Sequence, residues 1–191
     1  MRVDIPEDRP RLTLELRDGT EVWISPLTTR DRVTVEEGFE ELSEESRFTR
    51  FGLGLGHLSE SELDYLTDVD QRKHVAWGVS TTESQGIAVG RYITTEEGSA
   101  EIALTVMDAW QGRGVGTLLL RVLTAVGRAD GLEYFCFRYM PGNKGVQRML
   151  KGLEVHLNEA DGLMEGQVSL EVLPRADWDQ DAVMILDQVR G

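Results

Sequence analysis

The clearest pattern of apolar and polar positions lies between residues 99 and 131. Residues 101–107 alternate between two faces, and both faces are largely apolar, which is typical of a strand at the centre of a sheet. From Val115 to Ala129 the apolar residues recur at steps of three and four, which predicts an amphipathic helix. Gly131 follows where a left-handed residue ends such a helix. A buried strand, a glycine-rich turn and a helix are therefore expected in that order.

The chain before this stretch predicts a hairpin, three helices and two more strands. Residues 11–25 alternate on both sides of Asp18-Gly19, a strong signal for a tight hairpin, and Pro26 ends the second strand because it cannot donate to a ladder. A mobile loop is expected at residues 52–58, which hold three glycines. The expected helices span residues 28–42, 45–51 and 59–68, and the expected strands span 74–80 and 86–94.

The chain after residue 131 completes the predicted sheet. A strand is expected at 132–140, and because a helix crosses between it and the strand at 99–107, these two strands should be parallel neighbours. Asn143 is expected to cap a helix at 143–152. Two further strands are expected at 154–159 and 168–174, and a last helix shows an apolar face from Trp178 to Val189.

These elements predict an α+β fold, with a mixed, mostly antiparallel sheet of about six to seven strands and helices on both faces. We expect residues 1–10 to form a flexible arm and residues 11–174 to form one domain, which suits a chain of 191 residues. Residues 175–191 should pack their helix either on this body or on a partner subunit. A homodimer is thus a further expectation.

Composition narrows the class of protein. The net charge of −14 argues against a nucleic-acid-binding face and favours a cationic partner, although acidity can also serve solubility alone. Cys136 is the only cysteine and the chain begins with a charged segment, so we expect a reducing cytoplasm. No apolar run approaches the length of a membrane span, so no membrane association is expected. The three histidines share no ligand spacing, so we expect no metal.

The sequence Q-G-R-G-V-G at residues 111–116 has the chemistry of a phosphate site. Its glycines let backbone N–H groups turn toward one point at the positive end of the following helix, and Arg113 could meet a second phosphate bidentately. No Lys-Ser or Lys-Thr follows the last glycine, and the spacing is not that of the dinucleotide fingerprint. A nucleoside triphosphate or NAD is therefore disfavoured, and a plain strand-to-helix turn is the alternative.

In this setting, Q-G-R-G-V-G-T resembles the acyl-CoA pyrophosphate loop, Q/R-x-x-G-x-G/A, of the GNAT superfamily of N-acetyltransferases. The resemblance implies acetyl-CoA as the acyl donor and a parallel strand pair that splays apart to hold its thioester. It also implies a donor role for Asn143, which is compatible with that residue capping a helix. The implied donor-binding residues are Val106, Met107, Gln111, Gly112, Arg113, Gly114, Val115, Gly116, Thr117 and Asn143.

Two further segments resemble bacterial branches of the same superfamily. The opening D-G-T-E-V-W-I-S-P-L and the later L-S-E-E-S-R-F-T-R-F are similar to an amino-terminal pattern whose helices border the acceptor, which implies substrate selection near residues 39–58. Helix packing and capping remain the alternative for Arg47 and Arg50. From Gly86 to Leu173 the chain is similar to the catalytic domain of bacterial protein-lysine acetyltransferases.

In those enzymes the glutamate of the corresponding A-E-[IV]-A strand is taken as the general base, and it maps to Glu101. A base is useful because keeping a lysine amine neutral at pH 7 costs about 4.6 kcal/mol. The alternative is a charge that reaches solvent or an arginine. The tyrosine that many GNAT enzymes place after the asparagine as an acid has no counterpart at residues 147–151, and Tyr139 could approach instead or serve as a core aromatic.

The sequence therefore predicts an N-acetyltransferase that moves an acetyl group from acetyl-CoA to a primary amine by direct attack, with a protein lysine as first choice of acceptor. A small cationic amine, such as a polyamine or an aminoglycoside-like compound, is the alternative acceptor. A non-catalytic acyl-CoA-binding sensor is the rival from another class, and a structural domain without a ligand is the third.

Overall fold

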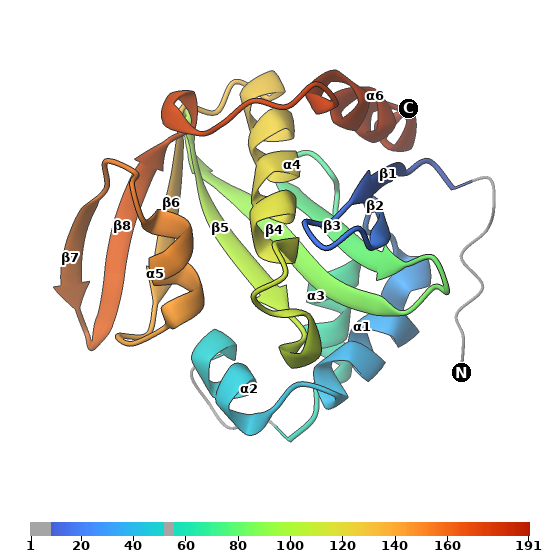
Figure 1. Ribbon diagram of the computed structural model, residues 1–191, viewed down its shortest axis with the longest axis horizontal. Coiled ribbons are helices and arrows are strands. Elements are labelled where there is room, and N and C mark those ends of the chain that lie inside the picture. Colours follow the sequence, from blue (N-terminus) through green and yellow to red (C-terminus); the bar gives the residue numbers. More distant parts are fainter. Residues whose placement is uncertain (1–8, 52–55) are drawn as a thin grey trace.

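The computed structural model describes residues 9–51 and 56–191 (Figure 1). Most of the expected arm at 1–10 and most of the expected loop at 52–58 therefore lie outside the described residues. The described chain forms one eight-stranded sheet with the strand order β1-β2-β3-β4-β5-β6-β8-β7. The strands are β1 (Leu12–Glu15), β2 (Glu21–Pro26), β3 (His74–Thr81), β4 (Gly86–Glu96), β5 (Ser99–Val106), β6 (Tyr134–Tyr139), β7 (His156–Ala160) and β8 (Leu163–Ser169).

Helices cover both faces of this sheet. Figure 1 shows α4 and α5 on one face of the sheet and α1 and α3 on the other, with α6 beside α4. All neighbouring strands pair antiparallel except β5 and β6, which are parallel. The predicted fold class is confirmed, with eight strands where about six to seven were expected. The helices are α1 (Arg32–Glu40), α2 (Glu44–Phe51), α3 (Glu60–Thr67), α4 (Val115–Ala129), α5 (Lys144–Leu150) and α6 (Asp179–Arg190).

Local sequence signals explain several element boundaries. The hairpin of β1 and β2 pairs Leu12 with Ile24 and Leu14 with Val22, and Gly19 supplies its positive φ of 82°. Helix α4 has the predicted bounds. Helix α3 begins after a full capping box of Ser59 and Glu62, in which each side chain bonds the backbone of the other. The alternation and capping rules were therefore sufficient for these elements.

The last strand differs from the prediction. It was expected at residues 168–174 but spans Leu163–Ser169, and residues 170–172 form a short 3-10 turn. The cause is a tight two-residue turn at Asp161-Gly162, where φ is 52° and 76°, so that Ala160 pairs directly with Leu163. An Asp-Gly pair is the preferred sequence for such a hairpin, and it starts the strand at once after the turn.

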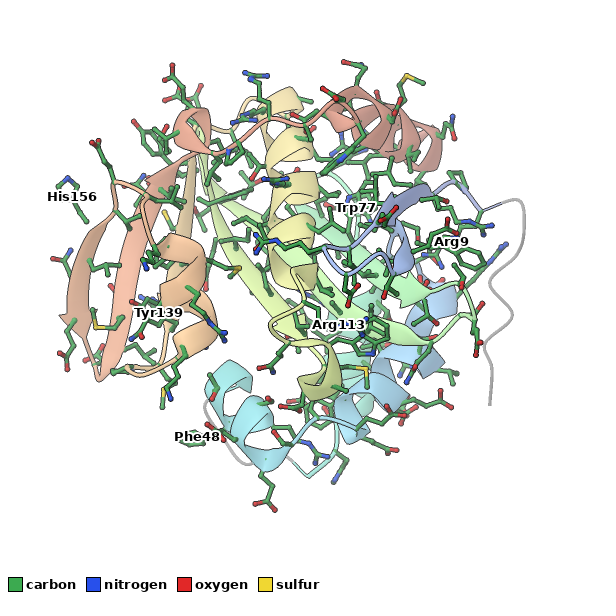
Figure 2. All side chains as sticks on the ribbon, in the orientation of Figure 1. Arg9, Phe48, Trp77, Arg113, Tyr139 and His156 are labelled. Atoms are coloured by element: carbon green, nitrogen blue, oxygen red, sulfur yellow. The ribbon has the colours of Figure 1, made fainter. Side chains whose placement is uncertain are left out.

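Two hydrophobic clusters stabilise the fold. The larger cluster fills the space between the sheet and α4 and includes Leu119, Trp77 and Phe135, which are fully buried (Figure 2 labels Trp77). The smaller cluster lies in the α1 and α3 layer and consists of Phe39, Leu42, Leu58, Leu63 and Leu66. The other face of the sheet is therefore covered by a layer with its own small core.

Helix α6 packs on α4 and on the first two strands. Ala182 and Leu186 are buried in this contact. At the end of α6, the Arg190 guanidinium donates to both carboxylate oxygens of Asp130, at 2.7 and 2.6 Å. Asp130 Oδ2 also accepts a hydrogen bond from the hydroxyl of the buried Tyr92, at an O–O distance of 2.5 Å. Helix α6 therefore contacts the body of its own chain.

Candidate active site

The sheet opens between β5 and β6. Their parallel ladder comprises only the pairs Ser99 with Tyr134, Ala100 with Phe135 and Glu101 with Cys136. Beyond Glu101, β5 continues to pair with β4 as far as Val106, whereas β6 continues to pair with β8. Figure 1 shows the two strands diverging from this short seam. The predicted parallel pair that splays apart is thus present, and Glu101 lies in the last pair before the gap.

The glycine-rich loop leads from the end of β5 into α4. Gly112 and Gly114 have positive φ values of 76° and 97°, and Gly114 is the N-cap residue of α4. Within the described residues, no protein group accepts a hydrogen bond from the backbone N–H groups of residues 112–117. A Cβ built on Gly112 would meet nothing within 4 Å. The loop therefore presents unpaired donors and open space at the positive end of a 15-residue helix.

Gly116 differs from the other two glycines of the loop. It lies in the first turn of α4 without a positive φ. A Cβ built on it would lie 3.5 Å from Val106 Cγ2 and 3.6 Å from Met149 Sδ, which are ordinary contacts. The backbone geometry of the loop thus requires glycine at positions 112 and 114 and accepts a side chain at 116.

The Arg113 guanidinium does not point where the sequence led us to expect. Arg113 Nε donates to Asp18 Oδ2 at 2.7 Å, Nη2 donates to Thr20 Oγ1 at 2.8 Å, and the guanidinium carbon lies 4.1 Å from the centre of the Trp110 ring (Figure 2). Hydrogen bonds from Thr20 and Arg113 lower the pKa of Asp18 to about 2. The guanidinium therefore joins the loop to the β1–β2 turn, which leaves the backbone N–H of Arg113 to serve the loop.

Arg17 is the cation that sequence reasoning missed. A Cβ built on Gly114 would lie 3.8 Å from Arg17 Cγ, Cδ and Nε, and Arg17 is exposed. Within the described residues its guanidinium has no ion pair. Residue 17 reaches the loop only because the hairpin folds over the start of α4, and a local motif gives no sign of that approach.

The remaining expected donor residues occupy varied positions. Val115 is buried in the main core, so only its backbone can face a ligand. Gln111 Nε2 donates to the carbonyl oxygen of Val106 at 3.2 Å, which fixes this side chain against the end of β5. Asn143 Oδ1 accepts from the N–H groups of Gly145 and Val146 at 3.0 and 3.1 Å, so Asn143 caps α5 as predicted.

Glu101 is exposed at the edge of the gap. Its carboxylate makes no hydrogen bond or ion pair within the described part of the chain, so the structure shows no arginine partner and leaves the alternative of a charge that reaches solvent. Its ladder partner Cys136 is half-buried, and burial followed by the nearby charges of Glu96 and Glu101 raises the pKa of that thiol. Glu101 is thus a free carboxylate beside the point where β5 and β6 separate.

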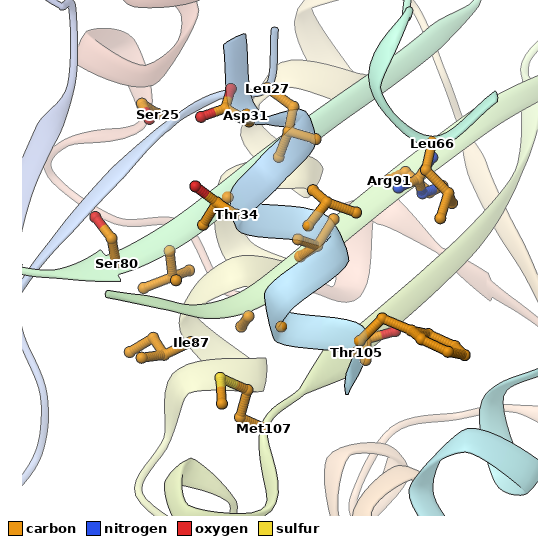
Figure 3. Close-up of a pocket in the computed structure, with 18 of the residues that line it drawn as sticks. Ser25, Leu27, Asp31, Thr34, Leu66, Ser80, Ile87, Arg91, Thr105 and Met107 are labelled. Carbon is orange, nitrogen blue, oxygen red and sulfur yellow. The ribbon is translucent and has the colours of Figure 1, made fainter. Parts of the chain in front are cut away.

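A largely apolar cavity of about 100 Å³ lies on the α1 side of the sheet (Figure 3). Ala103 and Thr105, which share a face of β5 with Glu101, line this cavity together with Phe39 of α1. Gly38 also lines it, and a Cβ built there would meet nothing within 4 Å. Met107, an expected donor residue, lines the cavity as well and is therefore on the side of the sheet opposite α4.

The segment between β5 and the glycine loop also contacts α2. Asp108 Oδ2 accepts from the N–H of Ser43 at 2.9 Å, and Asp108 Oδ1 accepts from the hydroxyls of Ser43 and Ser46 at 3.1 and 2.7 Å. Burial alone would raise the pKa of Asp108, but the bonds from Ser43 and Ser46 outweigh it and lower the pKa. Nothing in the sequence motifs pointed to this contact across 62 to 65 positions.

Arg47 has a structural role in the same region. Its Nε donates to the carbonyl of Leu42 at 3.0 Å and its Nη2 donates to the carbonyl of Glu40 at 2.6 Å. These bonds join α1 to α2, which is the packing alternative given for this residue. The side chain of Arg50 lies outside the described residues.

Comparison with known proteins agrees with this geometry. A model of the acetyltransferase (GNAT) domain matches residues 7–155. The chain belongs to the GNAT acetyltransferase family. The GNAT domain of PAT from S. lividans superposes with a TM-score of 0.78 at 26% identity, covering 86% of this chain and 99% of that domain. Members of this family use acetyl-CoA as acyl donor.

Two curated relatives extend the comparison. Acetyltransferase PA5475 of Pseudomonas aeruginosa is 35% identical over 126 residues, or 62% of this chain and 66% of the relative. Acetyltransferase Pat of Mycolicibacterium smegmatis is 26% identical over 184 residues, or 94% of this chain and 54% of the relative. The chain thus spans between about half and two thirds of the length of these relatives. The predicted resemblance to bacterial PAT enzymes is confirmed at the level of family and fold.

The described residues contain neither a candidate membrane span nor a candidate metal site. None of their helices is both long and apolar enough to cross a bilayer. No three side chains of histidine, cysteine, aspartate or glutamate in the described ranges gather in a geometry that could hold a metal ion.

Proposed function

We propose that this protein is an N-acetyltransferase in which the glycine loop holds the diphosphate of acetyl-CoA and Glu101 takes the proton from a primary amine. The amine nitrogen attacks the thioester carbonyl carbon, the new C–N bond forms, the C–S bond breaks, and CoA leaves as the thiolate. The ammonium form of the amine gives one proton to the Glu101 carboxylate before the attack, directly or through one water, and the second N–H proton, lost as the amide forms, goes to solvent water. The observation that carries this proposal is a free carboxylate in the last residue pair before the β5–β6 gap.

In this proposal the donor is held by the backbone of the glycine loop and by one cation, Arg17. Backbone N–H groups of residues 112–117 supply hydrogen bonds to phosphate oxygens, and the α4 dipole favours negative charge at this position. Arg17 stands beside Gly114 and supplies the positive charge that Arg113 gives instead to Asp18. We therefore assign the expected donor residues mainly through their backbone, with Arg17 as an added side chain.

A lysine side chain of a protein is the acceptor that the site supports best. Glu101 is exposed and does not lie inside the described cavity, so a macromolecule can bring an amine to it from solvent. The net charge of −14 favours a cationic acceptor. A small polyamine would share the second feature, so the acceptor panel below separates the two.

The first experiment measures donor binding and turnover. We expect acetyl-CoA to raise the melting temperature, and we expect free thiol to appear when a lysine-containing peptide is added as acceptor. Spermidine, an aminoglycoside and a peptide with only an α-amine complete the panel. Binding of acetyl-CoA without turnover on any of these amines would favour a non-catalytic acyl-CoA-binding sensor. The absence of any thermal shift would contradict the proposed acetyltransferase activity.

The second experiment tests the base. Glu101→Gln should leave CoA affinity within about twofold and lower turnover by about 10²- to 10⁴-fold, which is the usual range for a general base. Glu97→Gln is the matched control, because Glu97 is also an exposed glutamate and lies in the turn that precedes β5. Equal turnover in Glu101→Gln and Glu97→Gln would remove Glu101 from the mechanism.

A further inference from the structure

Asp108 joins two segments that the chain could otherwise move independently. It lies two positions after the end of β5 and three positions before Gln111, and its carboxylate accepts three hydrogen bonds from Ser43 and Ser46. Gln111 adds to this group, since its Nε2 lies 3.4 Å from both Ser46 Oγ and Asp108 Oδ1. We call Ser43, Ser46, Asp108 and Gln111 the polar junction. It connects the start of the glycine loop to the first turn of α2.

The hydrogen bonds to Asp108 are not needed to cap α2. Ser43 Oγ already accepts the N–H of Ser46 at 3.2 Å, which is the ordinary N-cap bond of a helix. The bonds to Asp108 come in addition to that cap and cross from one segment to another. Because Ser43 already caps α2, the bonds to Asp108 serve to fix the position of this helix relative to the loop.

The position of α2 matters because of where it lies. Figure 1 shows α2 at the open end of the gap between β5 and β6. Its Phe48 ring is 47% exposed and points away from the body in Figure 2, so apolar packing by this residue does not hold the helix. The donor loop and α2 therefore border the same gap and meet at Asp108.

We propose that Asp108 is a positioning residue that transmits occupancy of the donor loop to α2, and thereby sets the acceptor side of the gap. The inference rests on the proposed function. When phosphate groups order residues 112–117, the loop start at Gln111 and Asp108 is fixed as well, and the junction passes this order to Ser43 and Ser46. Each ligand then lowers the ordering cost of the other, which is positive coupling between two sites.

Amide hydrogen exchange with CoA as the probe tests the transmission without any acceptor. In the wild type, CoA should slow amide hydrogen exchange at the start of α4 and also in the first turn of α2. In Asp108→Asn, the loop should still gain protection while α2 gains none, because an amide offers one acceptor oxygen in place of two. Glu45→Gln, an exposed carboxylate in the same turn of α2, is the matched control and should behave as wild type.

Steady-state kinetics give a readout that a purely structural role would not move. With the lysine-containing peptide as acceptor, Asp108→Asn should raise the acceptor KM by about fivefold or more. Because the coupling is reciprocal, the acetyl-CoA KM at saturating acceptor should rise by a similar factor, while kcat and the affinity for CoA alone stay within about twofold. Ser46→Ala should change the KM values and kcat in the same way as Asp108→Asn. Ser46→Thr should keep the wild-type acceptor KM, because threonine retains the hydroxyl. The two serine variants keep the test decisive if Asp108→Asn folds poorly.

The outcomes separate the two proposals. If CoA protects neither the loop nor α2 in the wild type, the proposed function itself fails. If CoA protects the loop but not α2, or if Asp108→Asn and Ser46→Ala leave α2 protection and the acceptor KM unchanged, the donor site stands and the coupling is overturned. Loss of kcat without a change in acceptor KM would also overturn it.

Discussion

The glycines of the donor loop make distinct, quantitative predictions. Gly114 has a φ of 97°, so Gly114→Ala places a side chain in a backbone region that costs about 1–3 kcal/mol for a non-glycine residue. Space is not the problem, because the new Cβ would lie 3.8 Å from Arg17. For a chain of this size, about 2 kcal/mol lowers the melting temperature by about 4–8 °C. The loop can instead relax, which would turn its N–H groups away from the ligand.

Gly116→Ala is the internal control for this reasoning. Its backbone is helical and its new Cβ would make ordinary contacts with Val106 and Met149, so no strain is expected. The higher helix propensity of alanine should raise stability by up to about 1 kcal/mol.

Differential scanning fluorimetry with and without CoA measures both effects. We expect Gly114→Ala to lose melting temperature, or CoA affinity by about tenfold or more, or both, while Gly116→Ala keeps its melting temperature or gains. Equal losses in the two variants would refute the argument, because they would show that backbone conformation does not decide which glycine is required. An unchanged Gly114→Ala would refute it as well.

Three further predictions follow from other parts of the structure. Arg17→Ala should weaken CoA binding by about three- to tenfold in low salt and by less in high salt, because it removes the cation beside Gly114. Calorimetry measures the affinity, and a variant that binds CoA as tightly as the wild type at every salt concentration would exclude Arg17 from the site. Burial, followed by the Arg91 charge, lowers the pKa of His74 to about 4 in the folded protein. As the pH falls below 6.5, the imidazole is therefore protonated in the unfolded state before it is protonated in the folded state. The free energy of unfolding should fall between pH 6.5 and 4 by about 1–2 kcal/mol after solvent screening. Urea unfolding of wild type and His74→Gln over this range checks it, since the variant should lose less. Gly38→Ala should stabilise the protein by about 1 kcal/mol, because it adds helix propensity and its Cβ enters open space; a lower unfolding midpoint would contradict this.

Local patterns predicted the fold where one rule governed each element. The 3.6-residue period from Val115 to Ala129 and the left-handed Gly131 gave the bounds of α4, and the alternation around Asp18-Gly19 gave the first hairpin. The same Asp-Gly rule applies at Asp161-Gly162, where it starts the last strand at Leu163 and not at the predicted residue 168. The signal for this turn is therefore present in the sequence.

The candidate site could be predicted only as far as its backbone. Glycine spacing is a local property, so it marked the loop of residues 111–116. The destinations of long side chains depend on which segments fold together. Arg113 turned to Asp18, Arg17 approached Gly114, and Asp108 reached Ser46, in each case across more than 60 positions of chain. No pattern within one segment carries that information.

The small cluster in the α1 and α3 layer affects which part of the molecule unfolds locally. Phe39, Leu42, Leu58, Leu63 and Leu66 contact one another and stand apart from the larger cluster on the far side of the sheet. A unit with so little apolar area can unfold by itself at a modest free-energy cost, while the strands and α4 remain native. We therefore expect the α1 and α3 layer, which covers the cavity in Figure 3, to unfold as a separate cooperative unit, and limited proteolysis should cleave this layer long before it cleaves the sheet.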